Sequence, residues 1–135
     1  MALATFAKIA PVTPEQSAPI IPLTLSEVIN FSAFAVKIGL QGESVYVASK
    51  AGVEGFTRSI ARELAPFNVT VNCISTVPIK TNLTSKVPSS YINKFIEQQI
   101  INQQCKKVDI LNCVKIILSP ESDKITGDNF TIGGY

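Results

Sequence analysis

The chain has 135 residues, of which 46% are hydrophobic and 16% are charged, and its formal net charge at pH 7 is +2. A chain of this length forms at most one ordinary domain. The charged share is lower than the usual quarter of a soluble domain. Parallel strands that are buried on both faces produce such a bias. Half of a larger domain, with one face covered by the other half, would produce it too, and we expect both causes to contribute.

The residue inventory argues against several classes of function. There is no histidine, and Cys73, Cys105 and Cys113 show no C-x-x-C spacing, so we expect no zinc site of the usual Cys/His kind and no Ser-His-Asp or Cys-His hydrolase. The lysines are scattered and do not form the basic stripe of a nucleic-acid-binding protein. No run approaches the roughly 18 apolar residues of a membrane span. We therefore expect no metal, no nucleic-acid partner and no membrane partner.

The first 24 residues show no sustained hydrophobic period. They contain Pro11, Pro14, Pro19 and Pro22, and proline has no backbone N–H to donate in a helix or a sheet. The start of the chain lacks the basic lead and apolar core of a secretory signal, and it lacks the arginines of a transit peptide. We predict an extended or disordered lead over 1–24, a domain over 25–135 and a location in the cytoplasm.

Residues 25–135 carry a pattern of strand, helix, strand, helices and strand. Val53, Phe56, Ile60 and Leu64 follow helical spacing, and the run 69–74 is rich in β-branched residues. The expected elements are a strand over 28–32, a loop through Gly39 and Gly42, a helix from 44 or 45 to 64, a strand over 69–74, a loop over 75–84, helices over 88–104 and 107–118, and a strand over 129–132. This order predicts an α/β fold, the C-terminal half of a doubly wound, Rossmann-like parallel sheet with flanking helices.

Tyr46 and Lys50 are the residues that point most directly to chemistry. Residues four apart on a helix lie on one face, with Cβ atoms roughly 5–6 Å apart, so the phenol and the ammonium should point into the same space. A free tyrosine has a pKa of about 10, and a neighbouring positive charge favours the phenolate. The pair predicts a proton donor and acceptor with a cation that tunes it. An amphipathic helix with one aromatic residue and one solvated lysine would show the same spacing.

The residues around this pair carry a resemblance to a known family. The stretch 46–65, which begins Tyr-Val-Ala-Ser-Lys-Ala-Gly, resembles the short-chain dehydrogenase/reductase family, as do Asn-Val-Thr-Val-Asn-Cys-Ile over 68–74 and Ile-Thr-Gly-Asp-Asn-Phe-Thr-Ile-Gly-Gly over 125–134. They are most similar to its 3-oxoacyl-acyl-carrier-protein reductase branch. The resemblance covers residues 28–135. It implies interconversion of carbonyl and hydroxyl groups in a small-molecule substrate with NAD(P)H as cofactor, in a homo-oligomer.

The resemblance also implies roles for individual residues. Tyr46 would protonate the carbonyl oxygen as the general acid. Lys50 would tune the acidity of Tyr46 and hold the nicotinamide ribose hydroxyls. Ile79 would offer backbone groups to the carboxamide of the cofactor, and Thr81 would keep a hydroxyl near it. Tyr46 and Lys50 are thus the expected catalytic residues, and all four residues are the expected cofactor-binding set.

Two positions depart from the pattern of the family. Its third catalytic member is a serine thirteen positions before the tyrosine, where this chain has Ala33. Ser32 is adjacent, but neighbouring strand residues point to opposite faces, so Ser32 would need a one-residue bulge or a loop adjustment to take that place. The family also has Pro-Gly where this chain has Thr76 and Val77, and the Cβ of valine excludes conformations that glycine allows.

The glycine-rich phosphate-binding turn of the family, T-G-x-x-x-G-x-G, does not occur in this sequence. In a dinucleotide fold this turn lies in the first half, under the pyrophosphate. Residues 25–135 are therefore expected to be a partial domain that lacks the glycine-rich N-terminal half. Two hypotheses of function remain open: an NAD(P)(H)-dependent oxidoreductase represented by its C-terminal portion, or a truncated, catalytically inactive remnant that acts as an interaction or oligomerisation module.

Overall fold

The computed structural model describes residues 26–82 and 84–134. The lead expected over 1–24 lies outside the described residues, so that lead and the domain boundary at residue 25 stay predictions. The elements follow the order β1 (Glu27–Ala33), α1 (Ala35–Ile38), α2 (Ser44–Leu64), η1 (Ala65–Phe67), β2 (Thr70–Thr76), α3 (Ser89–Gln98), α4 (Lys107–Ile117), η2 (Pro120–Ser122) and β3 (Asn129–Thr131), where η marks a 3-10 helix.

Most of the expected elements are confirmed with small shifts of their ends, and two expectations are wrong. The loop expected after β1 contains the one-turn helix α1, which ends at Gly39 with a φ of 60°, a left-handed conformation that glycine adopts without a Cβ clash. The helix expected over 88–104 ends at Gln98. It stops there because the backbone N–H of Ile101 donates to the carbonyl of Gly133 in the C-terminal tail, at 3.2 Å.

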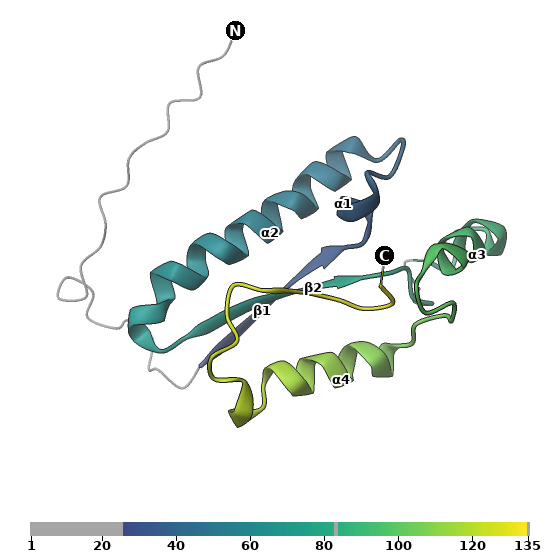
Figure 1. Cartoon of the computed structure of the whole chain (residues 1–135). Helices are drawn as coiled ribbons and strands as arrows, with labels where there is room; N and C mark the ends of the chain where they lie inside the picture. The colour runs from purple at the N-terminus through teal and green to yellow at the C-terminus, as the bar shows by residue number, and fades with distance from the viewer. Residues whose placement is uncertain (1–25, 83, 135) are drawn as a thin grey trace, which may run out of the picture.

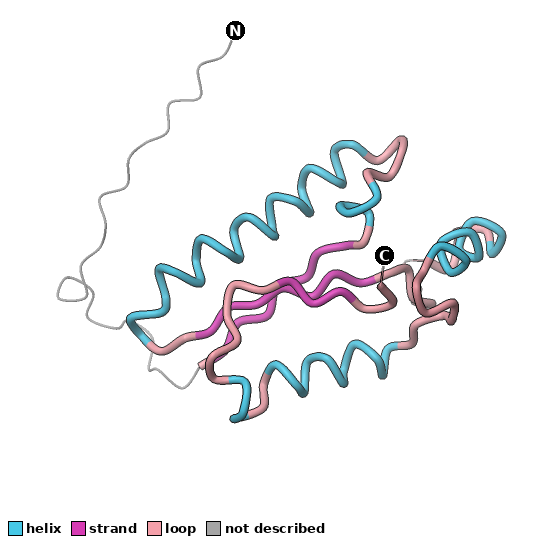
Figure 2. Tube along the Cα trace, viewed as in Figure 1, coloured by secondary structure: helices cyan, strands magenta, loops and turns pink. Residues whose placement is uncertain are grey.

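Three parallel strands form the sheet, in the order β1-β2-β3. β1 pairs with β2 in an unbroken register, from Glu27 opposite Thr70 to Ala33 opposite Thr76, and β2 pairs with β3 in the same direction. The carboxyl ends of the strands therefore meet at one edge. α2 covers one face of the sheet and α4 the other (Figure 1), and the Cα trace shows the same three layers (Figure 2). The predicted α/β class with a parallel sheet is confirmed.

Two apolar clusters hold the layers together. Ala61 on α2 packs against Val71 near the amino ends of the strands. Past the carboxyl ends, Phe34 and Val77 pack with Phe95 of α3, and the rings of Phe34 and Phe95 meet edge to face with centroids 4.9 Å apart. Between the two clusters, β1 contacts α2 through polar side chains: Asn30 donates to Thr57, and Ser32 donates to Glu54.

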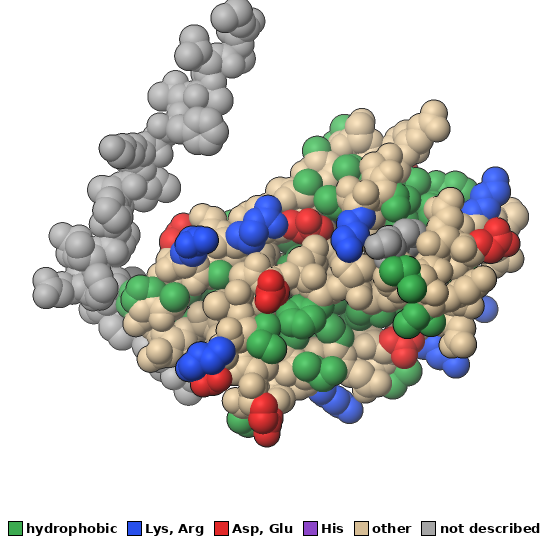
Figure 3. Space-filling view, in the orientation of Figure 1, with side chains coloured by type: hydrophobic (Ala, Val, Ile, Leu, Met, Phe, Trp, Pro, Cys, Tyr) green, Lys and Arg blue, Asp and Glu red, His purple; other side chains and the backbone are tan. Residues whose placement is uncertain are grey.

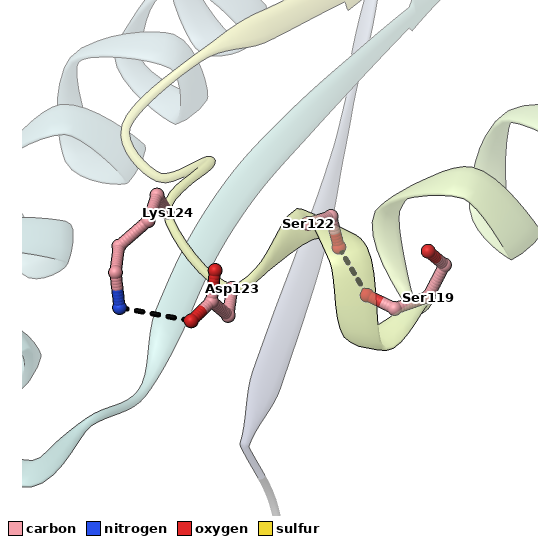
Figure 4. A network of polar contacts seen from close by, with 4 residues as sticks. All are labelled: Ser119, Ser122, Asp123 and Lys124. Atoms are coloured by element: carbon pink, nitrogen blue, oxygen red, sulfur yellow. Dashed lines mark hydrogen bonds and ion pairs between the residues drawn. The ribbon is translucent and has the colours of Figure 1, made fainter.

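The chain leaves α4 through a turn that its own side chains close (Figure 4). The Ser122 hydroxyl donates to the carbonyl of Ser119 at 2.7 Å and also to that of Ile117. On the surface, Lys124 Nζ lies 2.9 Å from Asp123 Oδ2, an exposed pair of the kind that adds little to stability. The turn redirects the chain from α4 into β3.

Large apolar side chains remain exposed on several elements, and Figure 3 shows such side chains between the charged ones on one face. On α4 they include Val108, Leu111 and Ile116, and on β1 Phe31 is half exposed. Among the described strands, β1 pairs only with β2, so its other edge offers unpaired backbone groups, which is a template for pairing with another strand. Within the described ranges, no helix has both the length and the apolar character needed to cross a membrane.

Ile117 and Ile116 give a matched test of which face of α4 is buried. Ile117 is 1% exposed and Ile116 is 61% exposed. Ile117→Ala should lower the free energy of unfolding by about 2–5 kcal/mol, because it removes buried methyl groups and leaves a cavity. Ile116→Ala should change it by less than about 0.5 kcal/mol. Urea unfolding followed by circular dichroism measures both, and equal losses would show that α4 does not pack on the sheet through Ile117.

Candidate functional site

Tyr46 and Lys50 lie on one face of α2, near the carboxyl end of β1. The Lys50 ammonium is 5.9 Å from the centroid of the Tyr46 ring, within the range of attraction between a cation and an aromatic face. It also donates a 3.1 Å hydrogen bond to the backbone carbonyl of Phe31 on β1. Tyr46 is 43% exposed. The structure thus brings the two residues together, as their spacing predicts, and leaves the phenol open to a ligand.

The turn before α2 places these residues over β1. Gly39 and Gly42 both have positive φ values, which let the chain reverse direction between α1 and α2 without a Cβ clash. Inside the first turns of α2, the Ser49 hydroxyl donates to the carbonyl of Tyr46 at 2.7 Å. The short connection makes α2 run back over the strand that precedes it, which is why Tyr46 and Lys50 lie near the end of β1 and not near its start.

One turn after Lys50, Glu54 forms a polar cluster with the sheet. Its Oε1 accepts hydrogen bonds from the Ser32 hydroxyl at 2.8 Å and from the Ser75 hydroxyl at 3.2 Å. The Ser75 hydroxyl also lies 2.9 Å from Oδ1 of Asn129. We call Ser32, Glu54, Ser75 and Asn129 the carboxylate cluster. Through it, one side chain of α2 is connected to β1, β2 and β3.

The bulge that would bring Ser32 into a third catalytic position is not present. The pairing of β1 with β2 continues without interruption through Ser32 and Ala33. The Ser32 hydroxyl points to the α2 side of the sheet, where it donates to Glu54 and lies 3.2 Å from the carbonyl of Lys50. Ala33 carries no hydrogen-bonding side chain. Neither of the two residues considered for this position therefore offers a free hydroxyl at the end of β1.

Val77, which replaces the glycine of the family's pattern, points into the core. It is buried and packs against Phe34 and Phe95. Its backbone does not need the conformation that favours glycine, because Asn68 is the only non-glycine residue with a positive φ in the described part of the chain. The side chain of Val77 is thus accommodated in the core, and its effect on a close backbone approach stays a prediction.

Ile79 and Thr81 lie in the loop that follows β2, at the same edge of the sheet as Tyr46 and Lys50. The loop is closed by a hydroxyl, because Thr84 Oγ1 donates to the carbonyl of Ile79 at 2.7 Å and accepts from the N–H of Thr81 at 2.9 Å. The carbonyl of Ile79 therefore accepts one hydrogen bond within the loop.

The residues at this edge offer donors for hydroxyl groups of a ligand, but no phosphate-binding turn. Lys50 uses one of its three donor positions on Phe31, which leaves two for the hydroxyl groups of a ligand. A glycine-rich turn that could receive the phosphates is absent from the sequence. In the part of the chain that the structure covers, no group of three or more His, Cys, Asp or Glu side chains could hold a metal ion.

Sequence reasoning missed Glu54 and Gln99. Glu54 follows Lys50 by four positions, just as Lys50 follows Tyr46, and this repeat was the available signal. Gln99 is buried, and its Nε2 has no hydrogen-bond partner among the described residues; nothing in the sequence marks it. Its Oε1 lies 3.9 Å from the Sγ of Cys105, beside a pocket between the α3–α4 loop and the C-terminal tail. The lining residues of that pocket are Ile101, Gln103, Gln104, Cys105, Asp109, Ile132 and Gly133.

Helices on both faces of a parallel sheet, with polar side chains at the carboxyl ends of its strands, define an α/β protein of the doubly wound class. A family model described as Enoyl-(Acyl carrier protein) reductase matches residues 10–135. The chain belongs to the short-chain dehydrogenase/reductase family, as the resemblance of its sequence predicts.

Two curated relatives show how much of the family's length this chain represents. It is 34% identical to human (3R)-3-hydroxyacyl-CoA dehydrogenase over 107 residues, which are 79% of this chain and 41% of the relative. It is 32% identical to the 3-oxoacyl-acyl-carrier-protein reductase of Staphylococcus epidermidis, with coverage of 79% and 44%. The chain thus spans less than half the length of these relatives.

Solved structures confirm the Rossmann-like fold. The structure of 4-hydroxyisoleucine dehydrogenase complexed with NADH is 31% identical, with a TM-score of 0.73 over 80% of this chain and 46% of that one. A short-chain dehydrogenase from Burkholderia cenocepacia J2315 in complex with NADP is 27% identical, with a TM-score of 0.71 over 80% and 44%. Both neighbours are complexes with a nicotinamide dinucleotide.

Cys73 allows a test of how closely α2 covers the sheet. It is fully buried on β2, and this burial, with a smaller contribution from the Glu54 carboxylate, raises the pKa of its thiol above its ordinary value. A group whose pKa is raised by folding contributes stability below its unfolded pKa and loses that contribution as the pH rises. The free energy of unfolding should therefore fall as the pH rises through the alkaline range in which a free thiol ionises, and it should fall less in Cys73→Ala. Urea titrations at several pH values measure both slopes, and identical slopes would mean that Cys73 is accessible to water.

Proposed function

We propose that this chain is the C-terminal, substrate-facing portion of an NAD(P)(H)-dependent oxidoreductase that interconverts a carbonyl and a hydroxyl group in a small molecule. The observation that supports it most is the Tyr46–Lys50 pair, with its ammonium 5.9 Å from the phenol ring at the carboxyl edge of a parallel sheet. The human 3-hydroxyacyl-CoA dehydrogenase and the staphylococcal 3-oxoacyl-acyl-carrier-protein reductase support a 3-oxoacyl group or a similar ketone as the substrate. The cytoplasm is the proposed location.

In this proposal Tyr46 is the acid of the reduction and the base of the reverse reaction. Its hydroxyl gives a proton to the carbonyl oxygen of the substrate as that oxygen gains charge, and a bound NAD(P)H supplies the hydride for the carbonyl carbon. Lys50, held by the carbonyl of Phe31, stabilises the phenolate through its positive charge and binds ribose hydroxyls with its remaining donors. Ile79 and Thr81 hold the carboxamide end of the cofactor.

A second candidate function is an inactive remnant that acts as an interaction or oligomerisation module. Ala33 favours it, because the site then lacks the second donor to the substrate oxygen, and so does the absence of the glycine-rich turn from these 135 residues. In both proposals the chain forms a homo-oligomer. The two differ in whether Tyr46 supports turnover once a phosphate-binding half is present.

Cofactor binding by the 1–135 chain alone should be weak. In a dinucleotide fold the pyrophosphate binds to N–H groups at the start of a helix after a glycine-rich turn, so without that turn we expect a Kd for NADH or NADPH no tighter than roughly 1 mM. Fluorescence titration of the reduced cofactor measures it. Micromolar binding would contradict the expectation. It would mean that these 135 residues contain a phosphate-binding site that we have not assigned.

The proposed function is tested in a chimera that restores a phosphate-binding half. The residues of the staphylococcal reductase that precede its matched region are joined to residue 26 of this chain, and reduction of a 3-oxoacyl thioester by NADPH or NADH is followed at 340 nm. We expect slow turnover, and Tyr46→Phe should lower it by about 10²–10⁴, the usual contribution of a general acid. Tyr91→Phe is the matched control, because Tyr91 is also 43% exposed but lies on α3. Equal losses in the two variants, or no turnover in the chimera, would contradict the proposal.

In the same chimera, Ala33→Ser tests the missing donor. Ala33 stands at the end of β1, and a hydroxyl there would add one oriented hydrogen bond to the substrate oxygen. We expect kcat to rise by about 10²–10³, the size found for one preorganised donor. The double variant Ala33→Ser with Tyr46→Phe should stay inactive, since the donor assists Tyr46 and does not replace it. An unchanged kcat in Ala33→Ser would mean that a different group already serves the substrate oxygen.

A further inference from the structure

We propose that Glu54 is a positioning residue for the Tyr46–Lys50 pair. Its carboxylate binds the hydroxyls of Ser32 and Ser75 and thereby fixes the N-terminal half of α2 over β1, so that Lys50 meets both the Phe31 carbonyl and the Tyr46 ring. The effect on turnover rests on the proposed function. The effect on the placement of Lys50 does not, because it follows from contacts within this chain.

Two consecutive residues of β1 form hydrogen bonds with side chains on two consecutive turns of α2. The carbonyl of Phe31 accepts from Lys50 Nζ at 3.1 Å, and the next residue, Ser32, donates to Glu54 Oε1 at 2.8 Å. Because Lys50 and Glu54 are four apart, they occupy one face of the helix. A shift of α2 along or around its axis that breaks the Glu54 contacts therefore also moves the Lys50 side chain away from the Phe31 carbonyl.

The two serines that bind Glu54 are shielded from water. Ser32 is 4% exposed and Ser75 is 2% exposed, and both hydroxyls lie within hydrogen-bond distance of the same carboxylate oxygen. Hydrogen bonds to an ionised acceptor are shorter and stronger than those between neutral groups. Each hydroxyl also has a weaker alternative acceptor, the carbonyl of Lys50 for Ser32 and Oδ1 of Asn129 for Ser75, so loss of the carboxylate costs the stronger of two bonds at each serine. The cluster therefore resists displacement of the helix more than exposed contacts would.

The fully buried side chains of α2 lie in its second half. The buried residues of the helix are Thr57 and Ala61, both on the C-terminal side of Glu54. Ala61 packs with Val71 near the amino ends of the strands. Tyr46 and Lys50 precede Glu54, so the carboxylate cluster is the buried contact of α2 that lies nearest to them.

Chemical labelling of lysines tests the placement of Lys50 without any cofactor or turnover. The native 135-residue chain is reductively methylated with formaldehyde and a borane, and the rate at each lysine is read by mass spectrometry. Glu54→Ala should speed labelling of Lys50 by about fivefold, the ratio that corresponds to one net hydrogen bond of about 1 kcal/mol. Lys115 on α4 is the internal reference, and its rate should stay unchanged.

Two further variants show whether the effect of Glu54→Ala on Lys50 comes from lost hydrogen bonds. Glu54→Gln tests the charge of Glu54, and Glu63→Ala tests the loss of any glutamate from α2. Glu54→Gln keeps an oxygen that accepts from Ser32 and Ser75, so Lys50 should be labelled as in the native chain. Glu63→Ala is the matched control, because Glu63 lies on the exposed face of α2 and is hydrogen-bonded by Ser59 at 3.3 Å; it should leave Lys50 unchanged.

Ser75→Ala keeps the test valid if Glu54→Ala does not fold. It removes one of the two donors, keeps Glu54 and lies on β2, away from Tyr46 and Lys50; it should also speed labelling of Lys50. An unchanged Lys50 rate in a folded Glu54→Ala or Ser75→Ala chain would overturn the proposal. So would a Glu54→Gln chain that labels as fast as Glu54→Ala, or an equal rise at Lys115, which would show general loosening.

The catalytic consequence is measured in the chimera described above. Glu54→Ala should lower kcat by up to about 10², the cost of misplacing a catalytic group by roughly 1 Å, while Glu54→Gln restores it and KM changes little. If labelling follows the expected order but the unmodified chimera shows no turnover, the proposed function fails and the role of Glu54 in placing Lys50 stands. If the chimera turns over and Glu54→Ala is as active as the parent, the positioning role is wrong.

Discussion

The register of β1 on β2 is the constraint on which the site depends. It sets Ser32 directly opposite Ser75, and since side chains at paired positions share a face of the sheet, the two hydroxyls lie together under α2. One carboxylate can then bind both. A slip of one residue would send every side chain of β1 to the other face, and Glu54 would lose Ser32. The position of α2, the helix that carries Tyr46 and Lys50, is in this way decided by the pairing of two strands.

From the C-terminal to the N-terminal half of α2, its contacts with the sheet change from apolar to polar. Ala61 meets Val71 near the amino ends of the strands, Thr57 accepts from Asn30 at 2.9 Å near their middle, and Glu54 meets the serines closer to the carboxyl ends. In the C-terminal half, burial of apolar side chains stabilises the packing of the helix, but it is non-directional and tolerates small shifts. In the N-terminal half, hydrogen bonds fix the orientation of the helix, because they weaken steeply when their angles are distorted. The Lys50 ammonium, which donates to the Phe31 carbonyl, lies in this polar half of the helix.

The sequence predicts those parts of the fold that local rules govern. Helical spacing predicts α2, and the four-residue separation of Tyr46 and Lys50 predicts that they meet; the β-branched run predicts β2. The end of α3 could not be predicted, because it depends on a hydrogen bond from Ile101 to Gly133, which lies far along the chain. Glu54 was missed for a similar reason. Its role depends on two serines, one on each of two strands, and neither serine is close to it in sequence.

The structure also separates two departures from the family's pattern that look alike in the sequence. Val77 replaces a glycine, and its side chain fills a cluster with Phe34 and Phe95. Ala33 replaces a hydroxyl, and the hydroxyl of the neighbouring Ser32 is already bonded to Glu54 in the carboxylate cluster. In the proposed function, the expectation of weak activity rests on Ala33 and on the absence of the glycine-rich turn from this sequence. Because the strand that carries Ala33 keeps its register through the last pair, the backbone that would present a serine there is already in place.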